Sequence, residues 1–182
     1  MPKLKLLILD AGVVIKLHEM ELWSTIVDRC DIHLSRIVAC QESKFHEVKE
    51  DDWGRDIDLS VDIESSAITV FDVVQEDVEA FKSQFDSNYF ADLDAGEAES
   101  LAFLVNQNDD YFISSGDAIV YKVLGNLNLG EQGISLEEIL GKCGLSRKIE
   151  GFQYSKAFRE QLTSMGATDM VQGRGKKRKQ HD

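Results

Sequence analysis

A short apolar run that ends in a carboxylate is the feature that most constrains the fold. Residues 4–9 hold five apolar side chains in six positions, and Asp10 follows them directly. A run this short and this apolar is typical of a central strand that is buried on both faces. Because a lone buried charge costs several kcal/mol unless it is compensated, the sequence predicts that a group near the end of this strand offsets the charge of Asp10.

Strand-like and helix-like segments alternate along most of the chain after this first strand. Further strands are expected at 32–40, 67–73 and 110–115, where β-branched and other apolar residues cluster. Apolar side chains at intervals of three and four residues predict the helices, and Ser135 with Glu138 forms the pattern of a capping box. This alternation predicts an α/β protein, a three-layer α/β/α sandwich around a mainly parallel sheet. The predicted helices cover residues 18–29, 76–85, 95–107, 116–125 (ending at Gly125), 135–144 and 155–166, one more begins near Glu42, and a short strand is expected at 127–130.

The length and the charge distribution predict one domain with a basic end. A chain of 182 residues with 43% hydrophobic residues can bury one substantial core, so we expect a single domain over residues 1–170 with an irregular acidic segment at about 50–66. The last ten residues hold five of the 20 Lys and Arg, although the net charge of the chain is −13. The acidic body would repel a nucleic-acid backbone, while the basic tail at 171–182, expected to be disordered, would attract one.

Other composition features exclude several classes of protein. No apolar run approaches the roughly 18 residues that cross a bilayer, so we expect a soluble, cytoplasmic protein with no membrane partner. Cys30, Cys40 and Cys143 are widely spaced and form no CxxC pair, and the four histidines form no metal-binding motif. Reduced thiols in the core are therefore expected, and a histidine-rich or zinc site is not.

Acidic residues follow two of the predicted strands and begin a predicted helix. Asp10 follows the first strand, and Asp117 follows the strand at 110–115 in the stretch SSGD. Ligands of parallel α/β sheets bind at the carboxyl ends of the strands, so both carboxylates are expected at one sheet edge. The helix at 95–107 brings further acids near its first turn, and another acid stands where an apolar segment becomes polar. These additional candidates are Asp94, Glu97, Glu99 and Glu42.

Converging carboxylates repel one another, and a cation among them keeps them ionised at neutral pH. Oxygen ligands without histidine or cysteine suit Mg²⁺ or Mn²⁺. Two such ions held about 4 Å apart can activate a water molecule and stabilise the leaving oxygen of a phosphodiester. The acidic set therefore predicts metal-dependent phosphodiester chemistry.

Each acid also has a purely structural explanation. Asp10 and Asp117 could cap the turn or helix that follows them. Acids in the first turn of the helix at 95–107 could complement the helix dipole, and Glu42 could be a solvated residue at a helix start. The order of the acids along the chain favours the shared site over these single explanations.

That order resembles the PIN-domain family. The shared features are a short N-terminal strand ending in Asp, an acid in the second helical unit, GEAES followed by LAFL, and a strand followed by a small residue and Asp. The similarity is to prokaryotic PIN-like proteins with a GExE-type helix start, and it extends over roughly residues 4–165. The stretch at 147–166 is similar to the basic turn and terminal helix of such proteins.

The resemblance implies a metal-dependent endoribonuclease, a hydrolase that often forms the toxin of a toxin–antitoxin pair. It places Asp10, Glu42, Glu99 and Asp117 in the catalytic pocket, with Asp10 as the central metal ligand and Glu97 as the neighbour that shares or replaces the role of Glu99. The implied cofactor is Mg²⁺ or Mn²⁺, and the implied partners are an RNA substrate and an antitoxin protein, with a homodimer as a further option.

Two other functions remain open from the sequence. The stretch LLILDAGVV has the strand, Asp and Gly-Val of a haloacid-dehalogenase-like phosphatase, but that family needs an acid two positions after the nucleophile, where this chain has Gly12. It also expects an acid about four residues after the GD pair, where Tyr121 stands. The third option is a non-catalytic PIN-like binding module whose acids are surface charge.

Overall fold

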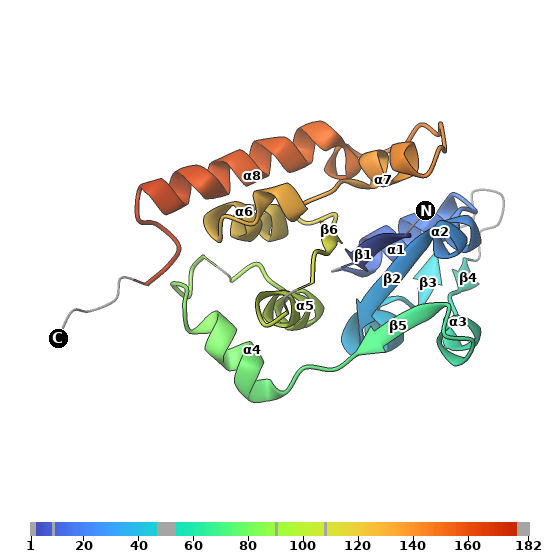
Figure 1. The fold of residues 1–182 in the computed structure, drawn as a ribbon, viewed down its shortest axis with the longest axis horizontal. Helices are drawn as coiled ribbons and strands as arrows, with labels where there is room; N and C mark the ends of the chain where they lie inside the picture. The colour runs from blue at the N-terminus through green and yellow to red at the C-terminus, as the bar shows by residue number, and fades with distance from the viewer. Residues whose placement is uncertain (1–2, 9, 47–53, 90, 108, 178–182) are drawn as a thin grey trace.

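The fold is built on a parallel sheet with one central strand pair. The structure, a computed structural model, describes residues 3–8, 10–46, 54–89, 91–107 and 109–177. Four strands form the main sheet in the order β5-β2-β1-β6, and every neighbouring pair is parallel. Helices flank this sheet (Figure 1), so the predicted α/β class is confirmed. The strands are β1 (Leu4–Ile8), β2 (Cys30–Ser35), β5 (Ile68–Phe71) and β6 (Phe112–Ser114).

The alternation of side chains along β1 divides the core into two halves. Leu6 and Ile8 lie in one apolar cluster and Leu7 in the other, and none of the three is exposed. Burying each such side chain contributes about 1.5–3 kcal/mol. The first cluster contains residues of α1 (Ala11–Glu19), α2 (Trp23–Arg29) and α7 (Leu136–Lys142), and the second contains residues of α4 (Gln75–Lys82), α5 (Ala95–Val105), α6 (Ala118–Asn126) and α8 (Lys156–Val171).

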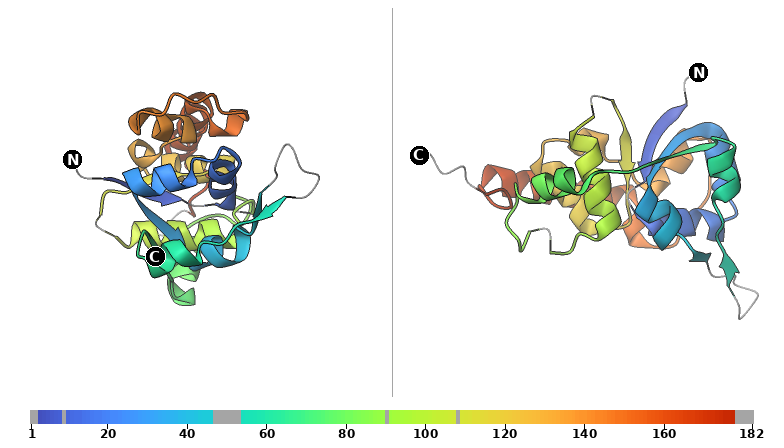
Figure 2. Two further views of the ribbon diagram at one scale, coloured as in Figure 1. Left: turned by 90° about the vertical axis from the view of Figure 1, so that its right-hand side faces the viewer. Right: turned by 90° about the horizontal axis from the view of Figure 1, so that it is seen from below.

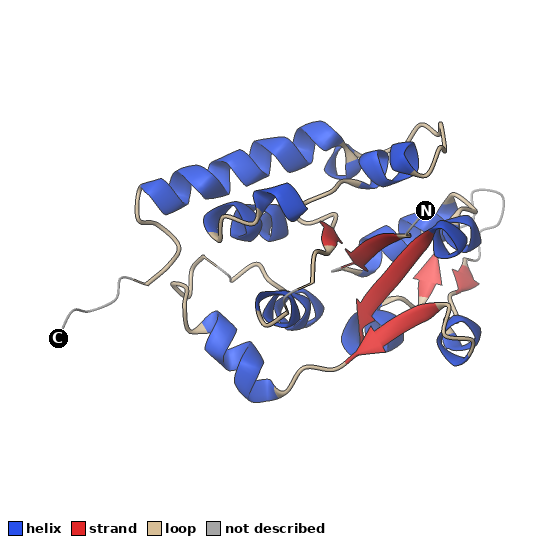
Figure 3. Ribbon diagram, in the orientation of Figure 1, coloured by secondary structure: helices blue, strands red, loops and turns tan. Residues whose placement is uncertain are grey.

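The helices of the second cluster lie together on one side of the strands in the view from below (Figure 2), and Figure 3 shows how much of the chain is helical. Among them, α6 and α8 run side by side (Figure 1). A Cβ atom at Gly166 would stand 1.9 Å from the backbone oxygen of Lys122, and one at Gly125 would stand 2.1 Å from that of Thr163. The two helices therefore approach closely because glycine stands at both crossing points. Gly125 does not end α6, as expected from the sequence, because the helix continues to Asn126.

Two predictions in the first fifty residues are wrong in their boundaries. The expected helix at 18–29 is divided, because Glu21 adopts a left-handed backbone conformation (φ 56°) between α1 and α2. The second strand ends at Ser35, whose hydroxyl accepts a hydrogen bond from the Val38 amide and begins a short π-helix, η1 (Val38–Glu42). Glu42 consequently ends a helical turn instead of starting one.

The expected strand at 127–130 is also wrong, because the chain turns there. Asn128 has φ 59°, the Leu129 amide donates to the Leu124 carbonyl, and a 3-10 turn, η2 (Gly130–Gln132), follows. Pairing with β6 occurs just afterwards, where the Ile134 amide donates to the Ile113 carbonyl over 2.8 Å. The predicted helix at 95–107 is confirmed as α5, and the capping box of Ser135 and Glu138 is confirmed at the start of α7.

The acidic segment expected to be irregular contains regular structure. β3 (Phe45–His46) pairs with β4 (Arg55–Asp56) in an antiparallel hairpin, and α3 (Ser60–Glu64) follows. Ile57 and Leu59 are buried in the first apolar cluster. Their alternation is the local signal of a segment that packs against the core, and the many acids around it obscured that signal.

The segment that follows α8, as far as residue 177, contacts residues that lie after α4 and at the end of α6. The Asp86 amide donates to the Gly175 carbonyl, the Lys177 amide donates to the Gln84 carbonyl, and Asn126 donates to the Arg174 carbonyl. Contacts therefore hold the first part of the expected basic tail as far as residue 177, and residues 178–182 lie outside the described part. In the part of the chain that the structure describes, no helix has the length and apolar character needed to cross a membrane.

Candidate metal centre

Asp10 lies beyond the carboxyl end of the central strand β1. Its side chain caps α1, because Oδ1 accepts a hydrogen bond from the Val13 amide over 3.2 Å. Oδ2 accepts two more, from the Ser115 hydroxyl (2.5 Å) and the Gly116 amide (2.6 Å). The neighbouring strand β6 ends at Ser114, so the parallel β1–β6 pair brings these donors to Asp10 across 105 residues of sequence. These three hydrogen-bond donors therefore partly compensate the buried charge of Asp10.

Ser115 organises the turn between β6 and α6. Its hydroxyl donates to Asp10 and accepts from the Asp117 amide over 2.9 Å. Tyr121, one turn into α6, is fully buried and accepts a hydrogen bond from the Ser115 amide over 3.2 Å. Asp117 occupies the N-cap position of α6, but its side chain makes no capping hydrogen bond. The Asp117 side chain is exposed, so its carboxylate is available to a ligand.

Glu97 lies in the first turn of α5, a separate element from those that carry Asp10 and Asp117. Asp94 and Glu97 form a capping box, in which the Glu97 amide donates to Asp94 over 2.8 Å and the Asp94 amide donates to Oε2 of Glu97 over 3.2 Å. The capping box fixes the Glu97 side chain, which is completely buried. Its other oxygen, Oε1, lies 3.4 Å from the Ser115 hydroxyl.

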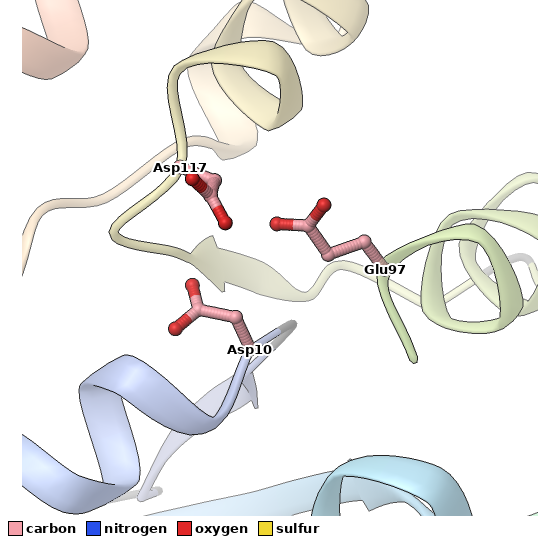
Figure 4. A group of neighbouring side chains, drawn as sticks. All are labelled: Asp10, Glu97 and Asp117. Carbon is pink, nitrogen blue, oxygen red and sulfur yellow. The ribbon is translucent and has the colours of Figure 1, made fainter. Parts of the chain in front are cut away.

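Three carboxylates consequently converge from three separate elements. One oxygen each of Asp10, Glu97 and Asp117 lies within 4.8 Å of the others. Figure 4 shows the three side chains pointing toward one another, from the β1–α1 junction, the start of α5 and the turn before α6. Oxygens at this spacing can all contact one cation, because hard divalent ions bind carboxylate oxygens at about 2.0–2.6 Å.

Burial and the charges of neighbouring acids raise the pKa of Asp10 and Glu97. Burial, together with the charges of Asp94 and Asp117, raises the pKa of Glu97 to about 9, and the hydrogen bond from the Asp94 backbone opposes this shift. Burial also raises the pKa of Asp10, against the opposing effect of its hydrogen bonds from Ser115, Gly116 and Val13. These shifts show that Asp10 and Glu97 are costly to ionise together without a positive charge beside them.

Glu42 and Glu99, two of the acids expected in the pocket, lie outside this group of three. Glu99 stands two positions after Glu97, so it emerges from a different face of α5. Its Oε1 accepts a hydrogen bond from the Val73 amide over 3.3 Å, and its buried Oε2 has no hydrogen-bond partner among the described residues. Glu42 is half-buried beside the start of α5, where burial and the charge of Asp94 raise its pKa while a hydrogen bond from the Gly96 backbone lowers it.

A pocket of about 430 Å³ opens over the group. Asp10, Glu42, Asp94 and Asp117 give it four carboxylates, and no basic side chain is among the described residues that line it. Glu97 lies beneath this surface. The remaining lining residues are Ala11, Gly12, Gly116, Gln153 and Tyr154.

Two features of the pocket wall restrict what fits beside Asp10. A Cβ atom at Gly12 would stand 2.7 Å from Oδ1 of Asp10, so any larger residue there would displace the carboxylate. Tyr154 reaches the pocket from the 3-10 turn η3 (Phe152–Tyr154), and its hydroxyl donates to the Gly12 carbonyl over 3.3 Å. Position 12 therefore has no room for an acid in this conformation of Asp10.

Three further residues shape the site. Asp94 is among the candidate acids near the start of α5, but the sequence analysis did not give it a capping role, although its spacing to Glu97 is the D-x-x-E signal of a capping box. Ser115 carried a weaker local signal, a hydroxyl two positions before an acid at a strand end. Tyr154 carried none, because its contact with Gly12 spans 142 residues of sequence.

Comparisons with known proteins identify no relative. The chain matches no protein-family model, no curated protein and no solved structure.

Proposed function

We propose that the chain is a metal-dependent endoribonuclease of the PIN-like type, with Asp10, Glu97 and Asp117 as ligands of Mg²⁺ or Mn²⁺. The observation that carries the proposal is the convergence of these three carboxylate oxygens within 4.8 Å. All three are hard oxygen donors, which is the chemistry that Mg²⁺ and Mn²⁺ prefer. Glu97 thus takes the metal-binding role that the family resemblance implies for Glu99, and the sequence analysis gives Glu97 as the alternative to it.

The raised pKa values support a cation at this position. Among the described residues, the hydrogen-bond partners of the Glu97 side chain are a backbone amide and a hydroxyl group, and none of them is a basic side chain. A cation would lower the pKa of Glu97 and Asp10 back toward their ordinary values, since opposite charge favours the ionised form. The same cation would reduce the repulsion between the acidic pocket and an RNA phosphate.

Residues of this chain would hold and orient the reacting groups. A bound divalent ion supplies polarisation of the phosphodiester and a water molecule of lowered pKa. Ser115 and the Gly116 amide fix the orientation of Asp10, and the capping box with Asp94 fixes that of Glu97. Asp117 is exposed at the mouth of the pocket, where its carboxylate can bind the ion and accept a hydrogen bond from water. Glu42 and Asp94 line the same pocket and can orient further water molecules.

The test measures cleavage of a fluorescently labelled single-stranded RNA in Mn²⁺. Asp10→Asn preserves the size of the side chain and removes the charge that binds the ion, so we expect cleavage by the native chain and none by the variant. Asp77→Asn, which changes an exposed acid on α4, is the matched control and should cleave at the native rate. Equal cleavage by the native chain and Asp10→Asn would identify a contaminating nuclease and contradict the proposal.

A parallel measurement separates the enzyme from the binding module. A ligand that binds only the folded chain raises its stability by about 2.7 kcal/mol at a concentration of 100 times Kd. Mn²⁺ that raises the thermal midpoint of the native chain but not of Asp10→Asn, without any RNA cleavage, would favour a non-catalytic module. The phosphatase alternative is not favoured, because Gly12 stands where its second acid is required. The antitoxin partner, the homodimer and the cytoplasmic location stay predictions from the sequence.

A further inference from the structure

The three cysteines of the chain lie in different surroundings. Cys30, where α2 gives way to β2, is fully buried, and Cys143, at the end of α7, is half-buried. Their sulfur atoms are 3.6 Å apart although the residues are separated by 113 positions. Cys40 is exposed on η1. All three are free thiols in this structure, but two of them are neighbours.

Contacts on either side hold the two thiols in place. The Arg29 guanidinium donates to the Cys143 carbonyl, so the residue before one cysteine binds the backbone of the other. Cys30 belongs to the apolar cluster that packs α1, α2 and α7 against the sheet, and Cys143 packs against that cluster. Their proximity therefore follows from the packing of this cluster and does not depend on two mobile side chains meeting by chance.

We propose that Cys30 and Cys143 are a site of reversible oxidation, at which a small disulfide such as oxidised glutathione converts the two thiols into an intramolecular disulfide. The sulfurs need to approach from 3.6 Å to a bond length of about 2.0 Å, a change that side-chain rotation and a small shift of the α7 end can supply. The site is independent of the candidate metal centre.

Exposure determines the order of the two exchange steps. The Cys143 thiolate is the accessible nucleophile, and it attacks one sulfur of the small disulfide, forming a mixed disulfide and releasing one thiolate. Cys30 then loses its proton and attacks the Cys143 sulfur, which forms the protein disulfide and expels the second thiolate. Two protein thiols are oxidised and one small disulfide is reduced to two small thiols. Burial raises the pKa of the Cys30 thiol, so the second step is expected to be slower and to accelerate with rising pH.

The bond would join the start of β2 to the end of α7 and enclose most of the chain. A disulfide that closes a loop of about 100 residues restricts the unfolded chain strongly. Glu42, Glu97, Glu99 and Asp117 all lie between the two cysteines in sequence, and Asp10 lies before them. The oxidised protein is therefore expected to resist unfolding more than the reduced protein.

The test uses the full chain with Cys40→Ser, which removes the exposed thiol and leaves the pair intact. After incubation with oxidised glutathione, the intact mass should fall by that of two hydrogen atoms, and a maleimide should find no free thiol. The thermal midpoint should rise by about 5 °C or more and return to its initial value in dithiothreitol. Cys40→Ser combined with Cys143→Ser, which retains only the buried thiol, should show neither the mass loss nor the midpoint rise.

Other products would overturn the proposal. Retention of two reactive thiols would show that the pair does not close, and a stable glutathione adduct would show that the second step fails. A covalent dimer would show that the sulfurs meet between chains instead of within one. Cys40→Ser combined with Cys30→Ser provides a second check, because its only thiol, Cys143, should take up a single glutathione and stop there.

Discussion

The Ser115 hydroxyl donates a 2.5 Å hydrogen bond to Oδ2 of Asp10, and this bond joins the segments that follow the neighbouring strands β1 and β6. The same hydroxyl accepts from the Asp117 amide, so one oxygen contacts two of the three residues whose carboxylates converge.

Ser115→Ala should weaken both the fold and the site. The substitution leaves the Asp117 amide without its acceptor and removes one of three donors to Asp10. Loss of a buried hydrogen bond costs about 1–3 kcal/mol in unfolding free energy, and loss of a group that orients a metal ligand costs about 10–100-fold in affinity.

Urea denaturation and Mn²⁺ titration calorimetry measure the two effects. Ser100→Ala is the matched control, since Ser100 is equally buried but its hydroxyl has no hydrogen-bond partner among the described residues; equal losses in both variants would contradict the role of Ser115.

Stability of the metal-free protein should fall as the pH rises, because of Glu97. Its pKa is about 9 in the folded chain and near the ordinary 4.5 in the unfolded chain. Between these values the folded chain keeps a proton that the unfolded chain releases, so this stabilising contribution is complete below 4.5 and is lost as the pH rises toward 9. Glu97→Gln should flatten this decline in urea denaturation with a chelator present, whereas Glu131→Gln, at an exposed site on η2, should preserve it. A native chain with no decline in this window would contradict the assignment.

Glu97→Gln and Glu99→Gln should have different effects on Mn²⁺ binding, although both acids lie near the start of α5. Glu97 lies in the converging group, whereas Glu99 uses Oε1 to accept from Val73. A glutamine at position 99 retains that acceptor, so we expect the Mn²⁺-induced rise in thermal midpoint to persist in Glu99→Gln and to disappear in Glu97→Gln. The reverse result would restore the ligand set that the family resemblance implies.

Gly12→Ala should impair the site although it adds a good helix former. The new methyl group would stand 2.7 Å from Oδ1 of Asp10 and 3.4 Å from the Tyr154 hydroxyl. Gly141→Ala is the control, because a Cβ there meets nothing within 4 Å and the substitution in α7 should add about 0.5–1 kcal/mol of stability. The expected result in Mn²⁺ calorimetry is a loss of affinity for Gly12→Ala and native affinity for Gly141→Ala.

The sequence predicted the elements better than the contacts between them. The β1 run and the α5 pattern are strong local signals, and both elements were placed correctly. The break at Glu21 was missed because the apolar spacing continues through it. The left-handed backbone conformation of Glu21 divides the helix there, and the presence of a glutamate does not predict that conformation.

The convergence of Asp10 and Asp117 was predictable from the sequence for a physical reason. Asp10 and Asp117 follow neighbouring parallel strands, and that placement is a consequence of the fold class. The choice between Glu97 and Glu99 depends on the rotation of α5 about its axis. That rotation is set by the capping box of Asp94 and by packing, and sequence register alone did not determine it.

The hydrogen bonds of Asp10 have a consequence for the growing chain during translation. Two of its three donors, Ser115 and Gly116, are synthesised more than a hundred residues after it, and Tyr154 follows later still. A ribosome-bound fragment that ends before β6 holds the first carboxylate and only one of its three donors, the Val13 amide. The centre therefore assembles only after β6 and the turn that follows it have emerged, and any activity that depends on it requires a chain that extends beyond Asp117.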